Sequence, residues 1–269
     1  MDIQAIASRT ILASFHGTRA RFTRKHREET RKVNQEHGTG DAAKVNVTQC
    51  EHPLLEAWDT IVEKEGRTFF DAHTRPTIDK GLKMIVKGAQ MKLVNVMAGI
   101  RARAMPIKDQ FMAIYPQLRL EAPTTLNGLF DPRPWKEPEV IEAKFHCDTR
   151  FLPMPLDGEW KDWAEASVMT AQLELKDRLE EAIRHVVTRC AKQQDGSFGR
   201  LHTSVFDNLK ELIDLVPDLD LEQDPVIAKI IAESRNIAEQ DKDELVKNPK
   251  DREAIAAEAN RILGMFGKK

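Results

Sequence analysis

Histidine, cysteine and aspartate side chains can ligate a metal ion, and the chain brings them close together in sequence at two places. The two groups are His37, Cys50 and His52, and His146, Cys147 and Asp148. Neither group has the spacing of a known zinc site, and adjacent residues on a strand point to opposite faces of a sheet. We therefore expect no bound metal ion.

Two motifs of catalytic loops are also incomplete. Gly38 and Gly40 lack the Lys-Ser/Thr pair and the preceding strand of a phosphate-binding loop, so this segment is expected to be a turn. Residues 196–199 read Gly-Ser-Phe-Gly and lack the spacing of a serine-hydrolase elbow. The sequence therefore predicts no catalytic residue and no cofactor, and it favours a protein that is not an enzyme.

A basic run near the N-terminus is the strongest chemical signal. Between Arg19 and Lys32 the chain has seven basic and two acidic residues. Such side chains bind phosphates, and salt weakens the contacts. Aromatic residues make up only 6% of the chain, which leaves little material for a base-stacking platform. If the protein binds nucleic acid, the sequence predicts contacts from Arg19, Arg21, Arg24, Lys25, Arg27, Arg31 and Lys32.

The C-terminal half has the opposite charge. Between Ser204 and Glu244 there are twelve acidic and four basic residues, although the whole chain of 269 residues has a formal net charge of only -2. Segregated charges either are solvated, face each other or select a partner. For a protein partner, the sequence predicts contacts with Asp214, Asp218, Asp220 and Glu222.

Apolar residues at spacings of three and four predict helices along the first 120 residues. We expect one whose apolar stripe begins at Ile3 and that ends near Gly17, a basic continuation over 19–36, and one over 54–70 that follows Pro53. Another is expected over 79–104, where Pro106 would end it, and a short one over 107–118, interrupted at Tyr115-Pro116. This region, 1–120, is predicted to be a basic helical part.

Six prolines lie between Glu121 and Asp157, so no long helix is expected there. Residues 126–130 resemble an apolar plug, and the alternation over 140–151 predicts one or two strands. We expect residues 121–160 to form an ordered crossover that holds a small β-hairpin. Trp135, Trp160 and Trp163 flank it, as core seals or as the lining of a pocket.

Residues 161–269 are predicted to form an acidic helical region. A nearly heptad-like stripe over 168–190 is typical of a coiled-coil pair. Ser204 and Asp207 resemble a capping box for a helix that Pro217 would end. The pairs Asp224-Pro225 and Asn248-Pro249 predict two further helix starts. The expected fold class is mostly α: a helical bundle with long, partly coiled-coil-like helices.

Composition predicts the solubility and the cellular location of the protein. Hydrophobic residues make up 41% of the chain and charged residues 31%, which is typical of a folded protein with wide solvated faces. Three cysteines form no C-x-x-C motif, so we expect a reducing cytoplasm. No stretch reaches the roughly 20 apolar residues of a membrane span, and the positive charge follows the apolar N-terminus, opposite to a secretory signal. We expect a soluble, cytoplasmic protein.

Several segments, taken in order over residues 10–235, resemble an uncharacterised family of bacteriophage and plasmid proteins. The matching segments are residues 18–22 with the basic run after them, 66–76 (Gly-Arg-Thr-Phe-Phe-Asp-Ala-His-Thr-Arg-Pro), 127–132 (Asn-Gly-Leu-Phe-Asp-Pro), Phe145 with 151–155, and 208–221 with Asp224-Pro225. Relatives of this type are often encoded near a MoxR-like AAA+ ATPase and a von Willebrand A-type protein.

The resemblance implies a protein partner. We therefore predict a non-enzymatic, phage-type accessory or adaptor protein that binds other chains, including a MoxR-like AAA+ ATPase and copies of itself, in the host cytoplasm. The alternative is a nucleic-acid-binding protein of phage DNA metabolism that uses the basic N-terminal segment.

Overall fold

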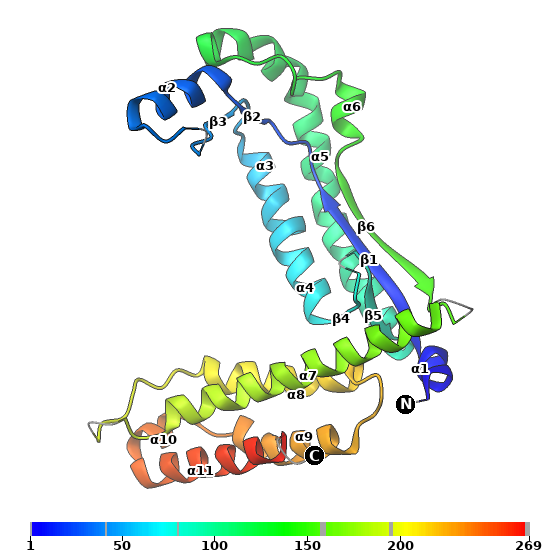
Figure 1. Ribbon diagram of the computed structural model, residues 1–269, viewed down its shortest axis with the longest axis vertical. Helices are drawn as coiled ribbons and strands as arrows, with labels where there is room; N and C mark the ends of the chain where they lie inside the picture. Colours follow the sequence, from blue (N-terminus) through cyan, green and yellow to red (C-terminus); the bar gives the residue numbers. More distant parts are fainter. Residues whose placement is uncertain (1, 41, 80, 157–159, 194–195, 267–269) are drawn as a thin grey trace. The chain divides into compact units, whose positions relative to one another are not determined.

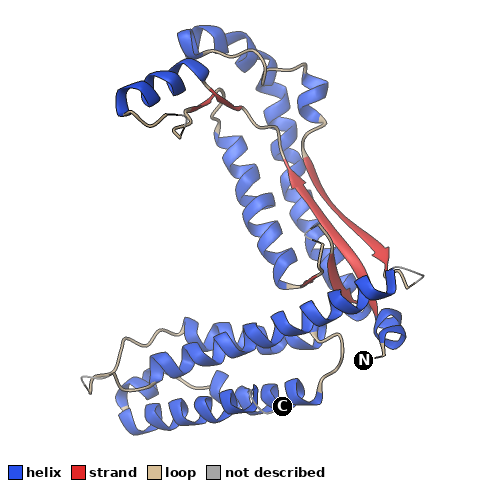
Figure 2. Ribbon diagram, viewed as in Figure 1, coloured by secondary structure: helices blue, strands red, loops and turns tan. Residues whose placement is uncertain are grey.

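A computed structural model describes residues 2–40, 42–79, 81–156, 160–193 and 196–266. The chain is mostly helical, with a small antiparallel sheet (Figures 1 and 2). It forms two compact units from interleaved segments. Unit 1 comprises Met1–Ser14, Ala72–Met91 and Phe151–Lys269, and unit 2 comprises Phe15–Asp71 and Lys92–Arg150. Composition had divided the chain into three consecutive regions, 1–120, 121–160 and 161–269, whereas contacts join distant segments.

Unit 1 contains a helical bundle formed by α7 (Trp160–Cys190), α8 (Ser204–Leu219), α9 (Pro225–Ala238), α10 (Lys242–Lys247) and α11 (Pro249–Phe266). The predicted stripe of α7 is buried at Val168, Leu175, Leu179 and Val186, and α7 packs against α8 and α11. The long helix is thus confirmed. Coiled-coil geometry for this pairing stays a prediction.

The start signals of the bundle helices have mixed outcomes. The Asp224 carboxylate accepts a hydrogen bond from the Val226 amide at 2.8 Å, so this cap is confirmed. The Ser204 capping box is wrong, because Thr203 is the residue before α8 and makes no side-chain cap. Pro217 lies inside the last turn of α8, which continues to Leu219. Its ring is exposed, so the distortion occurs on the solvent side.

The predicted N-terminal helix is largely wrong. Helix α1 covers only Ile3–Arg9, and strand β1 (Thr10–Thr18) follows. β1 pairs antiparallel with β5 (Lys83–Val86), which places Leu12 opposite Met84. The sheet order is β4-β5-β1-β6, with β4 at Arg75–Pro76 and β6 at His146–Pro153. Because β5 lies within residues 79–104, the first part of that predicted helix is also wrong.

Helix α5 (Gln90–Leu126) contradicts the proline rule used on the sequence. It continues through Pro106, Pro116 and Pro123, so the predicted stop at Pro106 and the break at Tyr115-Pro116 are wrong. All three rings are exposed, whereas residues such as Phe111 and Tyr115 are buried. A proline inside a helix costs about 3 kcal/mol or more, which burial of the opposite face offsets here.

Beyond Leu126 the crossover has short elements only: η3 (Asn127–Leu129), α6 (Pro138–Glu142) and β6. The predicted strand is confirmed for residues 146–151, whereas residues 140–142 of the same alternating segment lie in α6. The hairpin is not seen among the described residues, because the neighbour of β6 in the sheet is β1. Residues 126–130 are half-buried or exposed, so they are not an apolar plug.

The core of unit 2 uses most of its aromatic side chains. Helix α3 (Pro53–Trp58) continues into a π-helical segment (Asp59–Gly66) and α4 (Arg67–Ala72), which confirms the helix over 54–70. Trp58 packs edge-on against Phe145 at 5.0 Å between ring centroids, and Tyr115 stacks on Trp135 at 6.1 Å. Trp135 is therefore a core seal.

The remaining elements of unit 2 are β2 (Thr23–Lys25), α2 (Arg27–His37) and β3 (Asn46–Thr48). α2 ends at Gly38, whose φ of 61° is the left-handed conformation that glycine adopts without strain. The predicted continuous helix over 19–36 is thus a strand and a shorter helix. No described helix is long and apolar enough to cross a membrane.

Candidate nucleic-acid interface

The basic N-terminal run folds as a strand followed by a helix. β2 pairs antiparallel with β3, and Arg24 lies opposite Val47. All three residues of β2 are exposed. His26 follows, and its Nδ1 accepts a hydrogen bond from the Glu29 amide at 3.2 Å, which caps α2. The junction therefore presents Arg24, Lys25 and Arg27 at nearly consecutive positions.

Polar side chains hold α2 in place. Thr30 and Asn34, one turn apart, are buried. The Thr30 hydroxyl accepts from the Val45 amide at 3.0 Å, and the Asn34 amide group bonds both the N–H and the carbonyl of Ala43. Arg27 and Arg31 are likewise one turn apart, and both are exposed. The helix therefore presents two adjacent guanidinium groups.

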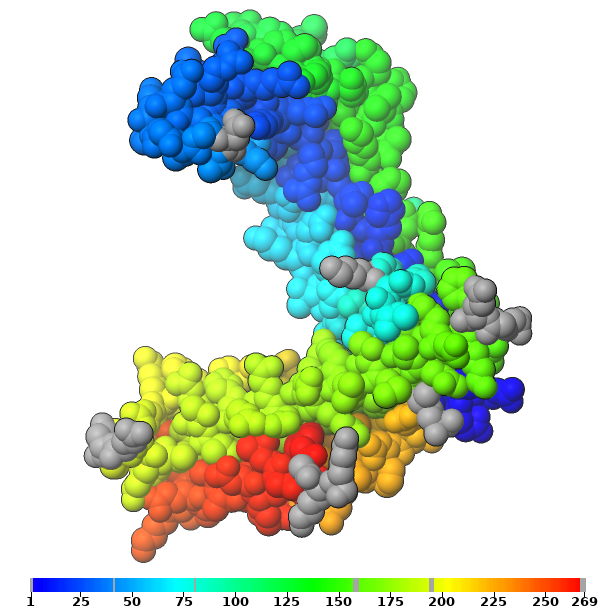
Figure 3. Space-filling view, in the orientation of Figure 1, coloured from blue at the N-terminus to red at the C-terminus, as the bar shows by residue number. Residues whose placement is uncertain are grey.

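Gln49 brings a distant loop to the same place. Its side chain is buried, donates to the Leu129 carbonyl at 2.9 Å and accepts from the Asp131 amide at 2.7 Å. These two bonds hold the segment that contains Phe130 and Arg133 beside β3. In the space-filling view the blue segment that contains β2 and α2 is at the surface, next to the green segment that follows α5 (Figure 3).

Two hollows adjoin here, and together we call them the basic groove. One has a volume of about 370 Å³ and the other about 430 Å³, and both are lined by Lys25 and Arg27. The first is lined in addition by Arg24, His26, Glu28, Val47, Gln49, Gly128, Phe130, Asp131, Pro132 and Arg133. The second is lined in addition by Thr30, Arg31, Asn34, Gln35 and Gly40. Cations therefore outnumber acids in both hollows.

The acids of the groove do not neutralise its cations. Asp131 is bonded by the Arg133 guanidinium, with the closest contact at 2.5 Å. This bond lowers the pKa of Asp131 to about 2, and the nearby charge of Arg24 adds to the effect. No carboxylate of a described residue lies within 4.0 Å of Arg24, Lys25, Arg27 or Arg31. Among the residues that the structure describes, these four positive charges thus have no carboxylate at ion-pair distance.

The other three predicted phosphate contacts have partners. Arg19 makes a bidentate pair with Asp59 at 2.7 and 2.6 Å, and its side chain is only 14% exposed. Lys32 binds Glu29 at 2.7 Å, and Arg21 lies 4.0 Å from Glu63. The partners of Arg19 and Arg21 lie outside the basic run, at Asp59 and Glu63, so composition could not separate these two from the four above, whereas the partner of Lys32, Glu29, lies within the run.

The predicted acidic contacts serve different purposes. Asp220 accepts from the Gln172 side chain at 3.1 Å and from three backbone amides of residues 222–224, so it shapes the turn after α8. Asp218 is half-buried and interacts within the chain. Asp214 on α8 and Glu222 after it are exposed.

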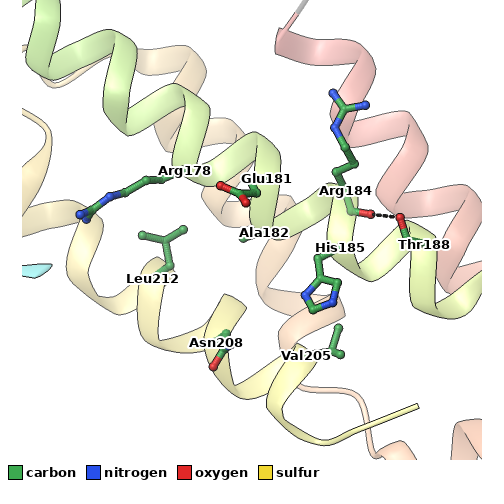
Figure 4. A pocket seen from close by; sticks show the side chains of 9 residues that line it. All are labelled: Arg178, Glu181, Ala182, Arg184, His185, Thr188, Val205, Asn208 and Leu212. Carbon is green, nitrogen blue, oxygen red and sulfur yellow. Dashed lines mark hydrogen bonds between the residues drawn. The ribbon is translucent and has the colours of Figure 1, made fainter. Parts of the chain in front are cut away.

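Unit 1 has a groove of its own between α7 and α8, with a volume of about 550 Å³ (Figure 4). It is lined by Arg178, Glu181, Ala182, Arg184, His185, Thr188, Val205, Asn208 and Leu212. Its two arginines have partners, because Arg178 binds Glu174 at 2.6 Å and Arg184 binds Glu180. This groove therefore lacks the unmatched charge of the basic groove.

The two groups considered as metal ligands do not converge. His146 stacks on His16 at 4.3 Å and lies 3.9 Å from Asp148, while His52 caps α3 through the Leu54 amide. Within the described ranges, no three His, Cys, Asp or Glu side chains are grouped so as to hold a metal ion.

Comparison with models of protein families, with curated proteins and with solved structures finds no match for this chain. Function must therefore be argued from the groove itself. Phe130, Arg133 and Gln49 were missed on the sequence, since only the fold brings the 127–133 loop to the basic run.

Proposed function

We propose that this protein binds nucleic acid through the basic groove. The observation that carries the proposal is the set of four exposed cations, Arg24, Lys25, Arg27 and Arg31, which share two adjoining hollows without an ion-pair partner among the described residues. Like charges held close together repel one another, and a polyanion relieves that repulsion. The phosphates of a nucleic-acid backbone recur at regular intervals, so that several of them can pair with these cations at once.

The geometry supports backbone contacts. Arg27 and Arg31 lie on successive turns of α2, Arg24 and Lys25 precede the helix on β2, and each of the four lines at least one of the two hollows. Such contacts fix register without reading sequence. Because α2 and the 127–133 loop are held by buried Thr30, Asn34 and Gln49, the cations are presented on an ordered frame.

Salt dependence gives a direct test. Four phosphate contacts predict a slope of log affinity against log salt of about -2.8 for a single strand and about -3.6 for a duplex. A fourfold rise in salt should therefore weaken single-strand binding about 50-fold. The measurement is fluorescence anisotropy of a labelled oligonucleotide titrated with protein at several salt concentrations.

The double variant Arg24→Ala/Lys25→Ala should halve this slope. The matched control is Arg178→Ala/Arg184→Ala, which removes two cations from the groove of unit 1, where both have carboxylate partners. An equal loss in the control, or binding that ignores salt, would contradict the proposal.

A protein–protein adaptor is the second candidate, and exposed apolar side chains on α7 favour it. Met169 and Leu173 are 59% and 60% exposed and lie one turn apart, so they form one apolar surface. With a purified MoxR-like AAA+ ATPase, coelution that Met169→Asp/Leu173→Asp abolishes would support a phage-type adaptor in the host cytoplasm. Light scattering of the protein alone would test self-association through the same surface.

A further inference from the structure

A third hollow of unit 2, with a volume of about 640 Å³, is lined by all three residues of β3. It is lined by residues 46–51, by one face of the end of α5 and by Trp135. We call it the β3–α5 cavity. Its size is within the range of about 300–1,000 Å³ that small-molecule sites occupy.

The β3–α5 cavity adjoins the basic groove. Val47 and Gln49 line both, so a single strand separates the unmatched cations from the cavity. Arg24 lies opposite Val47 in the ribbon, and side chains at opposite positions of antiparallel strands start about 4.5–5.5 Å apart. A phosphate held by Arg24 would thus lie beside the wall of the cavity.

The lining chemistry differs from that of the groove. Leu118, Ala122 and Leu126 provide apolar contact, and none of the described residues that line the cavity is a Lys or Arg. Its polar groups are the side-chain amides of Asn46 and Gln49, hydroxyls of Thr48 and Thr125, carboxylates of Glu51 and Glu121, and the Cys50 thiol. Burial raises the pKa of that thiol to about 11, which keeps it neutral. Apolar walls with both donor and acceptor groups suit a flat ring that bears N–H donors and acceptors, and the two carboxylates repel phosphate.

We infer that the nucleic acid is single-stranded and that one unpaired base enters the β3–α5 cavity while the neighbouring phosphates lie in the basic groove. The inference rests on the proposed function. Bases of a duplex are stacked inside the helix and must be extruded at a cost before they can enter such a cavity. Phe130, half-buried in the groove, adds an aromatic ring on which another base can stack.

The test compares three labelled oligonucleotides of one length by anisotropy: a single strand, the duplex, and a single strand with abasic sites. The wild-type protein should bind the intact single strand about tenfold more tightly than the other two, the size of one base contact. Equal affinity for all three would overturn the inference while leaving the proposed function intact. Failure to bind any of them at low salt would overturn both.

A filled cavity gives the second measurement. Thr125→Trp places a large ring in the cavity from an exposed position, and Thr124→Trp, also exposed but outside the lining, is the control. Thr125→Trp should lose about tenfold in single-strand affinity with unchanged duplex binding, and Thr124→Trp should bind as wild type. Equal behaviour of the two variants, each checked for folding by circular dichroism, would contradict the inference. The oligonucleotide comparison on wild-type protein stands independently of either variant.

Discussion

The cations around α7 in unit 1 and those at the start of α2 in unit 2 differ in whether a carboxylate pairs with them. In unit 1, buried Arg75 pairs with Glu174, which also binds Arg178, while Lys176 binds Asp224 at 2.9 Å. In unit 2, four cations of the basic groove, Arg24, Lys25, Arg27 and Arg31, have no such partner among the described residues, whereas Arg133 pairs with Asp131. Both units come from segments with strong local charge. A charge run therefore does not separate scaffold from binding surface, whereas the presence of a partner side chain does.

The largest effect is expected where a buried charge loses its partner. Glu174→Ala leaves Arg75, whose pKa burial lowers to about 10, without its carboxylate. Breaking a buried pair costs about 3–5 kcal/mol, and the partial exposure of Glu174 reduces this to about 3 kcal/mol of unfolding free energy. Urea denaturation followed by circular dichroism measures it. Glu180→Ala on the same helix removes an exposed partner and should cost less than about 0.5 kcal/mol.

The next effect concerns packing in unit 2. A Cβ on Gly17 would lie 2.7–2.8 Å from the Phe15 ring and from Val62 Cγ1, so Gly17→Ala should destabilise the protein by about 1–3 kcal/mol. Gly99 on α5 has nothing within 4 Å of such an atom. Gly99→Ala should instead stabilise by about 0.5–1 kcal/mol. Thermal melts measure the stability of both variants, and a lower stability of Gly99→Ala would contradict the packing argument.

Arg19 and Arg31 test the distinction between paired and unpaired cations within one basic run. Arg19→Ala breaks a bidentate pair and should cost about 2 kcal/mol of stability while leaving the salt slope of binding unchanged. Arg31→Ala should leave stability within about 0.5 kcal/mol and reduce the slope by about 0.7. Anisotropy measures the salt slope of binding of each variant, and urea denaturation measures its free energy of unfolding. A loss of stability in Arg31→Ala together with a smaller salt slope in Arg19→Ala would contradict the distinction between paired and unpaired cations.

The smallest effect is a pH dependence. Because its folded pKa is about 2 and its ordinary value is 3.8, Asp131 binds fewer protons in the folded state than in the unfolded state. Its contribution to stability is therefore complete above about pH 5 and is lost as the pH falls through about 2. Asp131→Asn should lose less stability than wild type over that interval. Urea midpoints at several pH values measure this, and parallel curves would show that the Arg133 contact contributes nothing.

Local signals predicted the bundle of unit 1 well, since the apolar stripe of α7 and the Asp224 cap depend on neighbours in sequence. The N-terminal sheet was missed because its pairing is remote. Ile11 fits a helical stripe, yet it is buried in a strand and lies opposite Ile85, more than 70 residues away. Helix α5 was cut short because a rule for isolated prolines ignores what the opposite face buries.

The sequence predicted the cations of the candidate site but not the residues that position the loop beside them. Arg24, Lys25, Arg27 and Arg31 followed from the charge of the run, but so did Arg19, which the fold pairs with Asp59, 40 positions away. Gln49 carries no sequence signal, although its amide joins residues 80 and 82 positions away. Such contacts depend on the tertiary fold.

The interleaving of the two units has a consequence for synthesis on the ribosome. When translation reaches Arg150, every residue of unit 2 exists, whereas α7 to α11 of unit 1 are still unmade. Ile3, Ile6 and Leu12 pack in the folded protein against Val168, Ala171 and Leu221, so this apolar leading segment emerges long before its core partners. Unit 2 is therefore expected to fold first on the nascent chain. Until α7 to α11 have been made, the apolar residues of the N-terminal segment are expected to stay exposed and to bind chaperones. Any single contiguous fragment that contains all of unit 1 also contains unit 2.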